Sequence, residues 1–288
     1  MAKEKKSAGN HMPQLAYKNL RFLESADARA LRILSEYLDP LAHLRKAGVQ
    51  HTVVFFGSAR VSPREAAIQK LREVELRIKQ GPAAGLQAEL KRARMGVHMS
   101  RYYEEARELS RLITAWAMTV NHSPRFLMVC SGGGPGIMEA ANRGASEAGG
   151  KSIGLNIRLP MEQKPNPYIP PELSMLFRYF FMRKLWFAQP AQALIVFPGG
   201  FGTMDEMFEF LTLIQTHKMG HRVNIFLYGS KFWKRVINFG WLLESGTISS
   251  EDLKLIHFVD SPQQAFGILK EELGLRFGLR PVIKHPFI

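Results

Sequence analysis

Short apolar runs alternate with amphipathic stretches along most of the chain. Consecutive β-branched, aliphatic and aromatic residues predict strands at 51–56, 126–130, 152–157, 193–197 and 222–228. Apolar residues at helical spacing predict helices between them, at 103–119, 136–148, 182–188 and 203–216. Strand, loop and helix in this repeated order predict an α/β fold, a Rossmann-like parallel sheet with helices on both faces.

Two helical segments fall outside this alternation. Leu31, Leu34, Leu38 and Leu41 stand at helical spacing before a stop at Lys46-Ala-Gly48, so residues 1–48 are expected to form a helical N-terminal extension. The charged stretch at 63–99, broken at Gly81-Pro82, predicts a helical hairpin. We expect this hairpin to be an insertion within a nucleotide-binding and catalytic domain that spans residues 49–288.

Composition places the chain among ordinary globular proteins, with 46% apolar and 22% charged residues. No apolar run approaches the roughly 20 residues that span a bilayer, and the Lys-rich start from Met1 to Asn10 is not followed by an apolar segment. The single cysteine, Cys130, excludes an intrachain disulfide and a four-thiolate zinc site. These features predict a cytoplasmic protein without membrane contact.

The net charge of +14, from 39 basic and 25 acidic residues, raises the question of an anionic partner. Between Arg64 and Arg111, however, basic residues alternate with glutamates, as on solvated helix faces. We therefore expect no nucleic acid partner and favour a small phosphate-bearing ligand.

Glycine loops follow three of the predicted strands. Ser131-Gly-Gly-Gly-Pro-Gly136 and Pro198-Gly-Gly-Phe-Gly-Thr203 each lie between a strand and a helix, and Gly57-Ser58 follows the first strand. In a parallel sheet, ligands bind beyond the carboxyl ends of the strands, where glycines allow close approach and helix N-termini attract anions. These loops are therefore candidates to hold a phosphate.

Three other familiar ligand-binding motifs fit this sequence poorly: the dinucleotide fingerprint, the P-loop and a histidine metal site. The glycine spacing departs from the dinucleotide fingerprint, and no acid ends the following strand at Ile157-Arg158. Gly150-Lys151-Ser152 resembles a P-loop, but it lies between a helix and a strand in the wrong order. His217 and His221 have no third ligand at a suitable spacing, so no metal site is expected.

The stretch Pro198-Gly-Gly-Phe-Gly-Thr-Met-Asp-Glu206 resembles the P-G-G-x-G-T-x-x-E signature of the LOG (Lonely Guy) phosphoribohydrolase family, also labelled lysine-decarboxylase-like. Upstream, Arg183-Lys184 matches the family's Arg-Lys pair. Further stretches resemble its longer bacterial members: Phe56–Arg60, Gly132–Glu139 with Ala140-Ala-Asn142, Gly154–Ile157 and Pro165–Tyr168. The resemblance covers residues 50–230, and the N-terminal extension and the 63–99 insertion are absent from shorter members.

The resemblance implies hydrolysis of the N-glycosidic bond of a nucleoside 5′-monophosphate, either AMP or a cytokinin riboside 5′-monophosphate, to free base and ribose 5-phosphate. Glu206 would stabilise the positive charge that forms on the ribose or activate water, and Arg183 would contact the ribose phosphate or the departing base. The matched motifs imply that the substrate is bound by Gly57, Ser58, Gly132, Gly133, Gly134, Glu139, Lys184, Gly199, Gly200, Gly202 and Thr203.

The resemblance also implies a homo-oligomer, a dimer or larger, with no cofactor. A decarboxylase would hold pyridoxal phosphate on a lysine, and Lys184 is the only lysine in the motifs, next to an arginine suited to the same phosphate. Two other functions stay open at this stage: a non-catalytic nucleotide-binding regulatory protein and a basic protein associated with nucleic acid.

Overall fold

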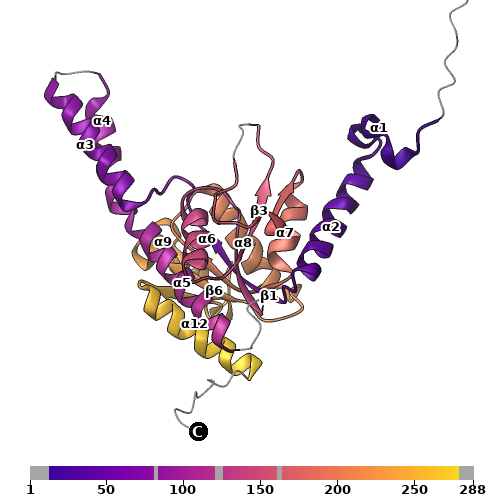
Figure 1. Cartoon of the computed structure of the whole chain (residues 1–288). Coiled ribbons are helices and arrows are strands. Elements are labelled where there is room, and N and C mark those ends of the chain that lie inside the picture. Colours follow the sequence, from indigo (N-terminus) through magenta and orange to yellow (C-terminus); the bar gives the residue numbers. More distant parts are fainter. Residues whose placement is uncertain (1–12, 81–83, 121–125, 161–163, 279–288) are drawn as a thin grey trace, which may run out of the picture.

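The computed structural model describes residues 13–80, 84–120, 126–160 and 164–278. Within these residues seven strands form one parallel sheet in the order β4-β3-β2-β1-β5-β6-β7 (Figure 1). The strands are β1 (His51–Phe56), β2 (Leu127–Ser131), β3 (Ser152–Ile157), β4 (Ser174–Phe177), β5 (Ala191–Val196), β6 (Asn224–Tyr228) and β7 (Ile256–Val259). The predicted Rossmann-like fold class is confirmed.

Side chains of the central strands alternate between two hydrophobic layers, one on each face of the sheet. On one face, Val53 and Phe55 of β1 pack with α5 (Arg101–Val120), α6 (Ile137–Glu147) and α12 (Pro262–Phe277). On the other, Val54 and Phe56 pack with α7 (Phe180–Ala188), α8 (Phe201–Gln215) and α9 (Ser230–Val236). Strands buried on both faces explain the continuous apolar runs in the sequence.

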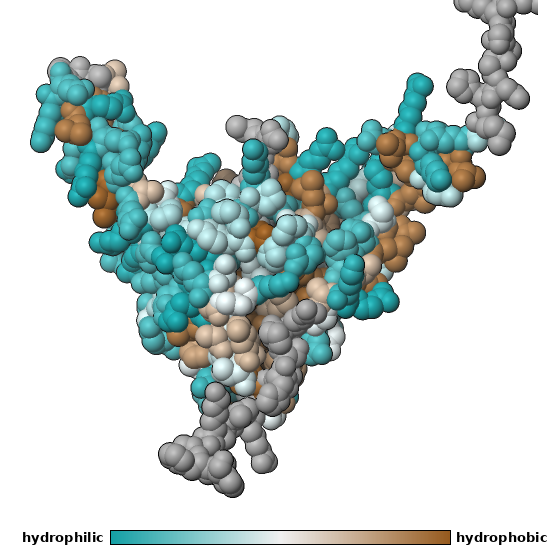
Figure 2. Space-filling view, viewed as in Figure 1, coloured by the Kyte–Doolittle hydropathy of each residue, from teal (hydrophilic) through white to brown (hydrophobic). Residues whose placement is uncertain are grey.

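The N-terminal extension is helical, as predicted. After the 3₁₀ turn η1 (Ala16–Lys18) come α1 (Leu20–Glu24) and α2 (Arg29–Lys46), which form an arm that projects from the body (Figure 1). Leu31, Leu34 and Leu38 are about half exposed on this arm, where hydrophobic side chains gather (Figure 2). Leu44 of α2 is part of the core, and Ile33 and Leu41 pack against that core. The predicted leucine stripe therefore lies mostly outside the core.

The insertion forms α3 (Arg64–Gln80) and α4 (Leu86–Met99), packed together as a second projecting arm (Figure 1). The predicted break at Gly81-Pro82 lies outside the described residues, as do Met1 to Asn10. The division into an extension and a domain beginning at residue 49 stays a prediction.

Several elements escaped the sequence prediction. The edge strands β4 and β7 are only four residues long, and each is only partly buried. The 3₁₀ turn η2 (Pro171–Leu173) precedes β4, and α10 (Phe239–Glu244) and α11 (Ser250–Leu253) precede β7. Helices α7 and α8 begin two residues earlier than predicted, at Phe180 and Phe201, and β6 begins two residues later, at Asn224.

Candidate functional site

A cavity of about 690 Å³ lies beyond the carboxyl ends of the central strands. Its walls come from the loops that follow β1, β2, β3 and β5 and from α7 and α8. Because β1 lies between β2 and β5, the three glycine loops predicted from the sequence meet at this edge. Most of the predicted site residues line the cavity: Gly57, Ser58, Gly132, Gly134, Arg183, Gly200, Gly202, Thr203 and Glu206.

Backbone hydrogen bonds tie the three loops together. The Ser58 amide donates to the Pro198 carbonyl over 3.1 Å, and the Ile137 amide donates to the Ser58 carbonyl over 3.2 Å. Gly136 has a φ of +73°, and a Cβ there would overlap the Ser58 carbonyl. A side chain at position 136 would therefore push the first two loops apart.

The third loop, which follows β5, places the N-terminus of α8 at the cavity. Gly200 is the N-cap residue, and Gly202 and Thr203 occupy the first turn. The first amides of a helix have no partner within the helix, and the helix dipole is positive there, so this end of the cavity favours an anion.

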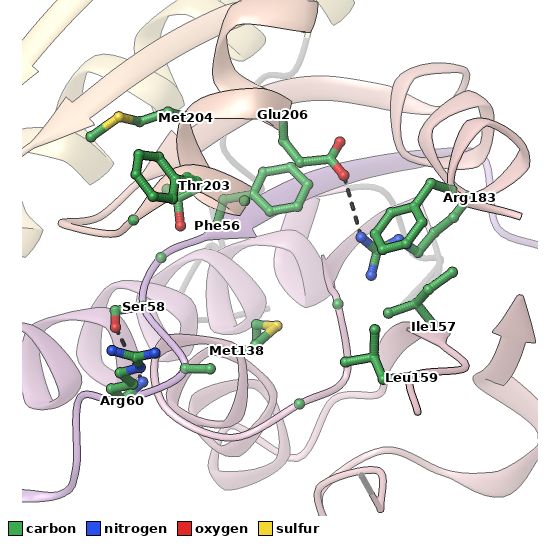
Figure 3. Close-up of a pocket in the computed structure, with 18 of the residues that line it drawn as sticks. Phe56, Ser58, Arg60, Met138, Ile157, Leu159, Arg183, Thr203, Met204 and Glu206 are labelled. Atoms are coloured by element: carbon green, nitrogen blue, oxygen red, sulfur yellow. Dashed lines mark hydrogen bonds and ion pairs between the residues drawn. The ribbon is translucent and has the colours of Figure 1, made fainter. Parts of the chain in front are cut away.

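Arg183 and Glu206 lie next to one another at one end of the cavity (Figure 3). The Arg183 Nη2 lies 3.5 Å from the Glu206 Oε1, and the two side chains are only 12% and 4% exposed. The guanidinium also lies within cation–π range of the Phe180 and Phe187 rings.

This pair leaves two buried polar atoms without partners. The Arg183 Nε and the Glu206 Oε2 form no hydrogen bond with any described residue. Burial raises the pKa of Glu206 to about 7, although Arg183 and Lys184 oppose the shift, and burial lowers the pKa of Arg183. Buried polar atoms without partners are costly, so both atoms are suited to a ligand that would complete their hydrogen bonding.

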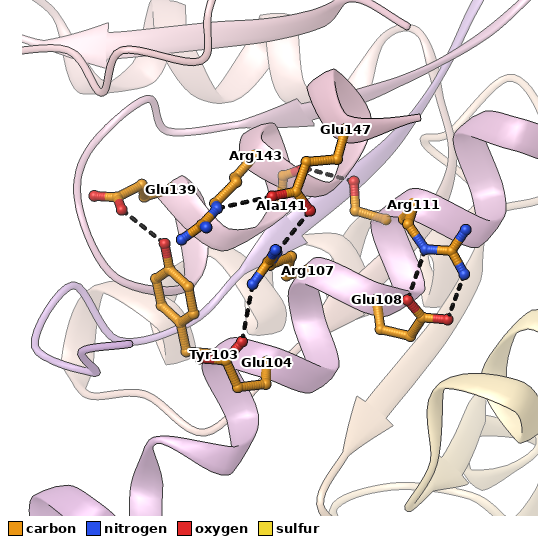
Figure 4. A network of polar contacts seen from close by, with 10 residues as sticks. Tyr103, Glu104, Arg107, Glu108, Arg111, Glu139, Ala141, Arg143 and Glu147 are labelled. Atoms are coloured by element: carbon orange, nitrogen blue, oxygen red, sulfur yellow. Dashed lines mark hydrogen bonds and ion pairs between the residues drawn. The ribbon is translucent and has the colours of Figure 1, made fainter. Parts of the chain in front are cut away.

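Four predicted substrate-binding residues lie outside the cavity lining. The Lys184 Nζ lies 2.8 Å from Asp205 Oδ2 and 2.7 Å from Glu209 Oε2, so this side chain links α7 to α8 beside the Arg183–Glu206 pair. The Tyr103 hydroxyl donates to Glu139 over 2.7 Å, in a polar network between α5 and α6 (Figure 4).

The other two predicted residues outside the cavity lining, Gly133 and Gly199, are glycines that permit close packing. A Cβ at Gly199 would overlap the Thr203 side chain, and one at Gly133 would overlap Asn156. The Asn166 Nδ2 donates to the carbonyls of both Gly133 and Gly134 over 3.1 Å. These contacts fix the glycine loops, so Gly133 and Gly199 shape the cavity from behind its surface.

Sequence reasoning missed the remaining lining residues. Arg60 lies in the first matched stretch and extends the Ser58 loop, but it had not been singled out. The others are mostly apolar; several lie inside the matched stretches, but nothing in the sequence singled them out: Phe56, Ala59, Met138, Asn156, Ile157, Leu159, Phe180, Phe201 and Met204. Only the strand order brings these side chains together.

Residues 138–269 match the family model described as "Possible lysine decarboxylase". Over these residues the chain is similar to the lysine-decarboxylase-like (LOG) family. The match begins in α6 and ends in α12, so it includes both Arg183 and Glu206. No curated protein matches the chain.

Solved structures similar to this chain include the structural-genomics protein TM1055, at 19% identity and a TM-score of 0.45, over 77% of this chain and 99% of that one. The molybdenum cofactor carrier protein of Chlamydomonas reinhardtii has 16% identity and a TM-score of 0.44, over 78% and 99%. The molybdenum cofactor binding protein of Rippkaea orientalis has 18% identity and a TM-score of 0.41, over 60% and 88%.

Neither a metal cluster nor a membrane-spanning helix is found in the described part of the chain. No three His, Cys, Asp or Glu side chains gather there in a way that could hold a metal ion. His221 directs its Nε2 to the Ala191 carbonyl at 2.6 Å rather than to His217. None of the described helices is both long and apolar enough to cross a bilayer.

Proposed function

We propose that this protein belongs to the LOG family and is a nucleoside 5′-monophosphate phosphoribohydrolase. The reaction would consume one water, break the bond between the base and the ribose C1′, and yield the free base and ribose 5-phosphate. The observation that carries the proposal is the buried Arg183–Glu206 pair, with an unpartnered atom on each side chain, in a cavity that also holds a helix N-terminus.

The chemistry of the pair suits this reaction. As the bond to the base breaks, positive charge develops on the ribose ring, and the Glu206 carboxylate would stabilise it. Because the pKa of Glu206 is about 7, the carboxylate form is present near neutral pH. Arg183, which lies within cation–π range of Phe180 and Phe187, would donate a hydrogen bond to the departing base or to a ribose oxygen.

The residues present fit lysine decarboxylation poorly. That chemistry would need pyridoxal phosphate bound to a neutral lysine amine, and no lysine is found among the described residues that line the cavity. Although burial opposes the shift, hydrogen bonds to Asp205 and Glu209 raise the pKa of Lys184 and so stabilise its charged form. We therefore propose no cofactor.

We also propose a cytoplasmic homo-oligomer with no nucleic acid or membrane partner. Phe180, Phe181 and Leu185 of α7 are 40–51% exposed beside the cavity, and such a cluster of exposed apolar side chains suits a subunit contact.

Incubation with a panel of nucleoside 5′-monophosphates, followed by chromatography of the free base, tests the proposal. Glu206→Gln and Arg183→Ala should each lower kcat by about 10²- to 10³-fold, the usual effect of removing an electrostatic stabiliser. Circular dichroism and calorimetric binding of AMP would establish that the variants keep the fold and the cavity. Tight AMP binding by wild-type protein without base release would instead support a non-catalytic nucleotide-binding regulator.

A further inference from the structure

Two cationic side chains, Arg60 and Arg183, are found among the described residues that line the site cavity. Arg183 is mostly buried and paired with Glu206, whereas Arg60 is exposed and lies well apart from it beside Ser58 (Figure 3). The Arg60 guanidinium forms no hydrogen bond or ion pair with any described residue, and only its backbone amide is engaged, donating to Ser58 Oγ over 3.1 Å. Its charge is therefore available to a ligand.

The groups that share the Arg60 end of the cavity also suit an anion. Ser58 contributes a hydroxyl, Thr203 contributes another, and Gly200 and Gly202 lie at the N-terminus of α8. No carboxylate lines this end among the described residues, because Glu206 lies at the Arg183 end. A phosphate placed here would meet a helix N-terminus, two hydroxyls and an uncompensated guanidinium.

We propose that Arg60 binds the 5′-phosphate and makes the site selective for a nucleoside 5′-monophosphate over the corresponding nucleoside. This inference rests on the proposed function. A guanidinium can donate two parallel hydrogen bonds to phosphate oxygens, which a lysine ammonium cannot do in the same geometry. The phosphate would then lie at the Arg60 end and the ribose next to Glu206.

Arg60 also lines a second cavity, of about 290 Å³, between its own loop and the base of the α3–α4 arm. That cavity is also lined by Arg92 and by Lys70, which is ion-paired with Glu89, and none of these three lines the site cavity. Arg92 therefore provides a matched control, since Arg92→Ala removes an exposed arginine from the same region without touching the site.

The experiment compares kcat/KM and calorimetric affinity for AMP and for adenosine in wild type, Arg60→Ala, Arg60→Lys and Arg92→Ala. We expect Arg60→Ala to lower kcat/KM and affinity for AMP by about 10- to 100-fold and to leave the values for adenosine within about 2-fold. Arg60→Lys should recover part of the loss, Arg92→Ala should match wild type, and inorganic phosphate should compete less well with AMP in Arg60→Ala.

An equal loss for AMP and adenosine in Arg60→Ala, or no loss for either, would overturn the assignment. Wild-type protein that binds AMP without releasing base would refute the proposed reaction, and the affinity ratio of AMP to adenosine would still decide the role of Arg60. Wild-type protein that binds AMP and adenosine equally would refute the phosphate role of Arg60 whatever the reaction.

Discussion

Replacing Glu206 by glutamine removes a buried carboxyl group whose proton affinity depends on folding. In the folded protein burial raises the pKa of Glu206 from 4.5 to about 7, whereas in the unfolded chain the carboxyl group is solvated and keeps its ordinary value. Between pH 4.5 and pH 7 the folded state therefore binds more protons than the unfolded state. Linkage requires the stability of the wild-type protein to fall as the pH rises through this interval.

The magnitude follows from the size of the shift. At about 1.4 kcal/mol per pKa unit, a rise from 4.5 to about 7 corresponds to about 3 kcal/mol. This pH-dependent contribution of Glu206 to the free energy of unfolding is fully present below pH 4.5. It declines as the pH rises to about 7 and is lost above that pH. Glutamine does not titrate, so the stability of Glu206→Gln relative to wild type should increase by about 3 kcal/mol between pH 4.5 and pH 8.

Urea unfolding of both proteins at several pH values from 4.5 to 8 would measure this difference. Groups that titrate equally in both proteins cancel, and Glu251→Gln, the same change at an exposed position on α11, serves as the control. Parallel pH–stability curves for wild type and Glu206→Gln would refute the reasoning, because they would mean that Glu206 is solvated in the folded protein.

Three further predictions concern activity and assembly. Base release should rise with pH with an apparent pKa of about 7 in kcat/KM, because the reaction needs the Glu206 carboxylate; a profile flat from pH 5.5 to 8.5 would contradict this role. Lys184→Met should move that pKa upward, because Asp205 and Glu209 lose their counter-charge beside Glu206, and Lys184→Arg should restore it in the same pH–rate assay. Excision of residues 63–99 across a Gly-Ser link should change the oligomer size seen by light scattering more than kcat, and loss of activity with native assembly would count against an assembly role.

The central strands and the glycine loops that meet at the cavity could be predicted from the sequence because both leave local signals. Val53 to Phe56 form an unbroken apolar run, and the glycine loops mark the ends of β1, β2 and β5. The apolar wall of the cavity left no such signal. Ile157 ends β3 and Leu159 follows it, so the strand order brings both to the cavity, whereas Phe180 lies about one helical turn before Arg183 on α7.

Lys184 shows a second reason why the sequence alone could not predict the whole site. A motif of two adjacent cations suggests that both contact the substrate, but consecutive residues of a helix point about 100° apart. Arg183 faces the cavity, so Lys184 is directed toward the carboxylates of α8. Its role as a substrate-binding residue stays a prediction, and its contacts support a positioning role.

The central place of β1 in the sheet has a consequence for the order in which the protein acquires its structure during synthesis. His51 pairs with Leu127 of β2, and Thr52 pairs with Ala191 of β5, so neither partner of this early strand is close to it in sequence. Contacts of such long range slow folding, because a large loop must close before they form. A nascent chain thus carries the apolar β1 with an unpaired edge until β5 has left the ribosome, and a fragment that ends before Ala191 should aggregate rather than fold.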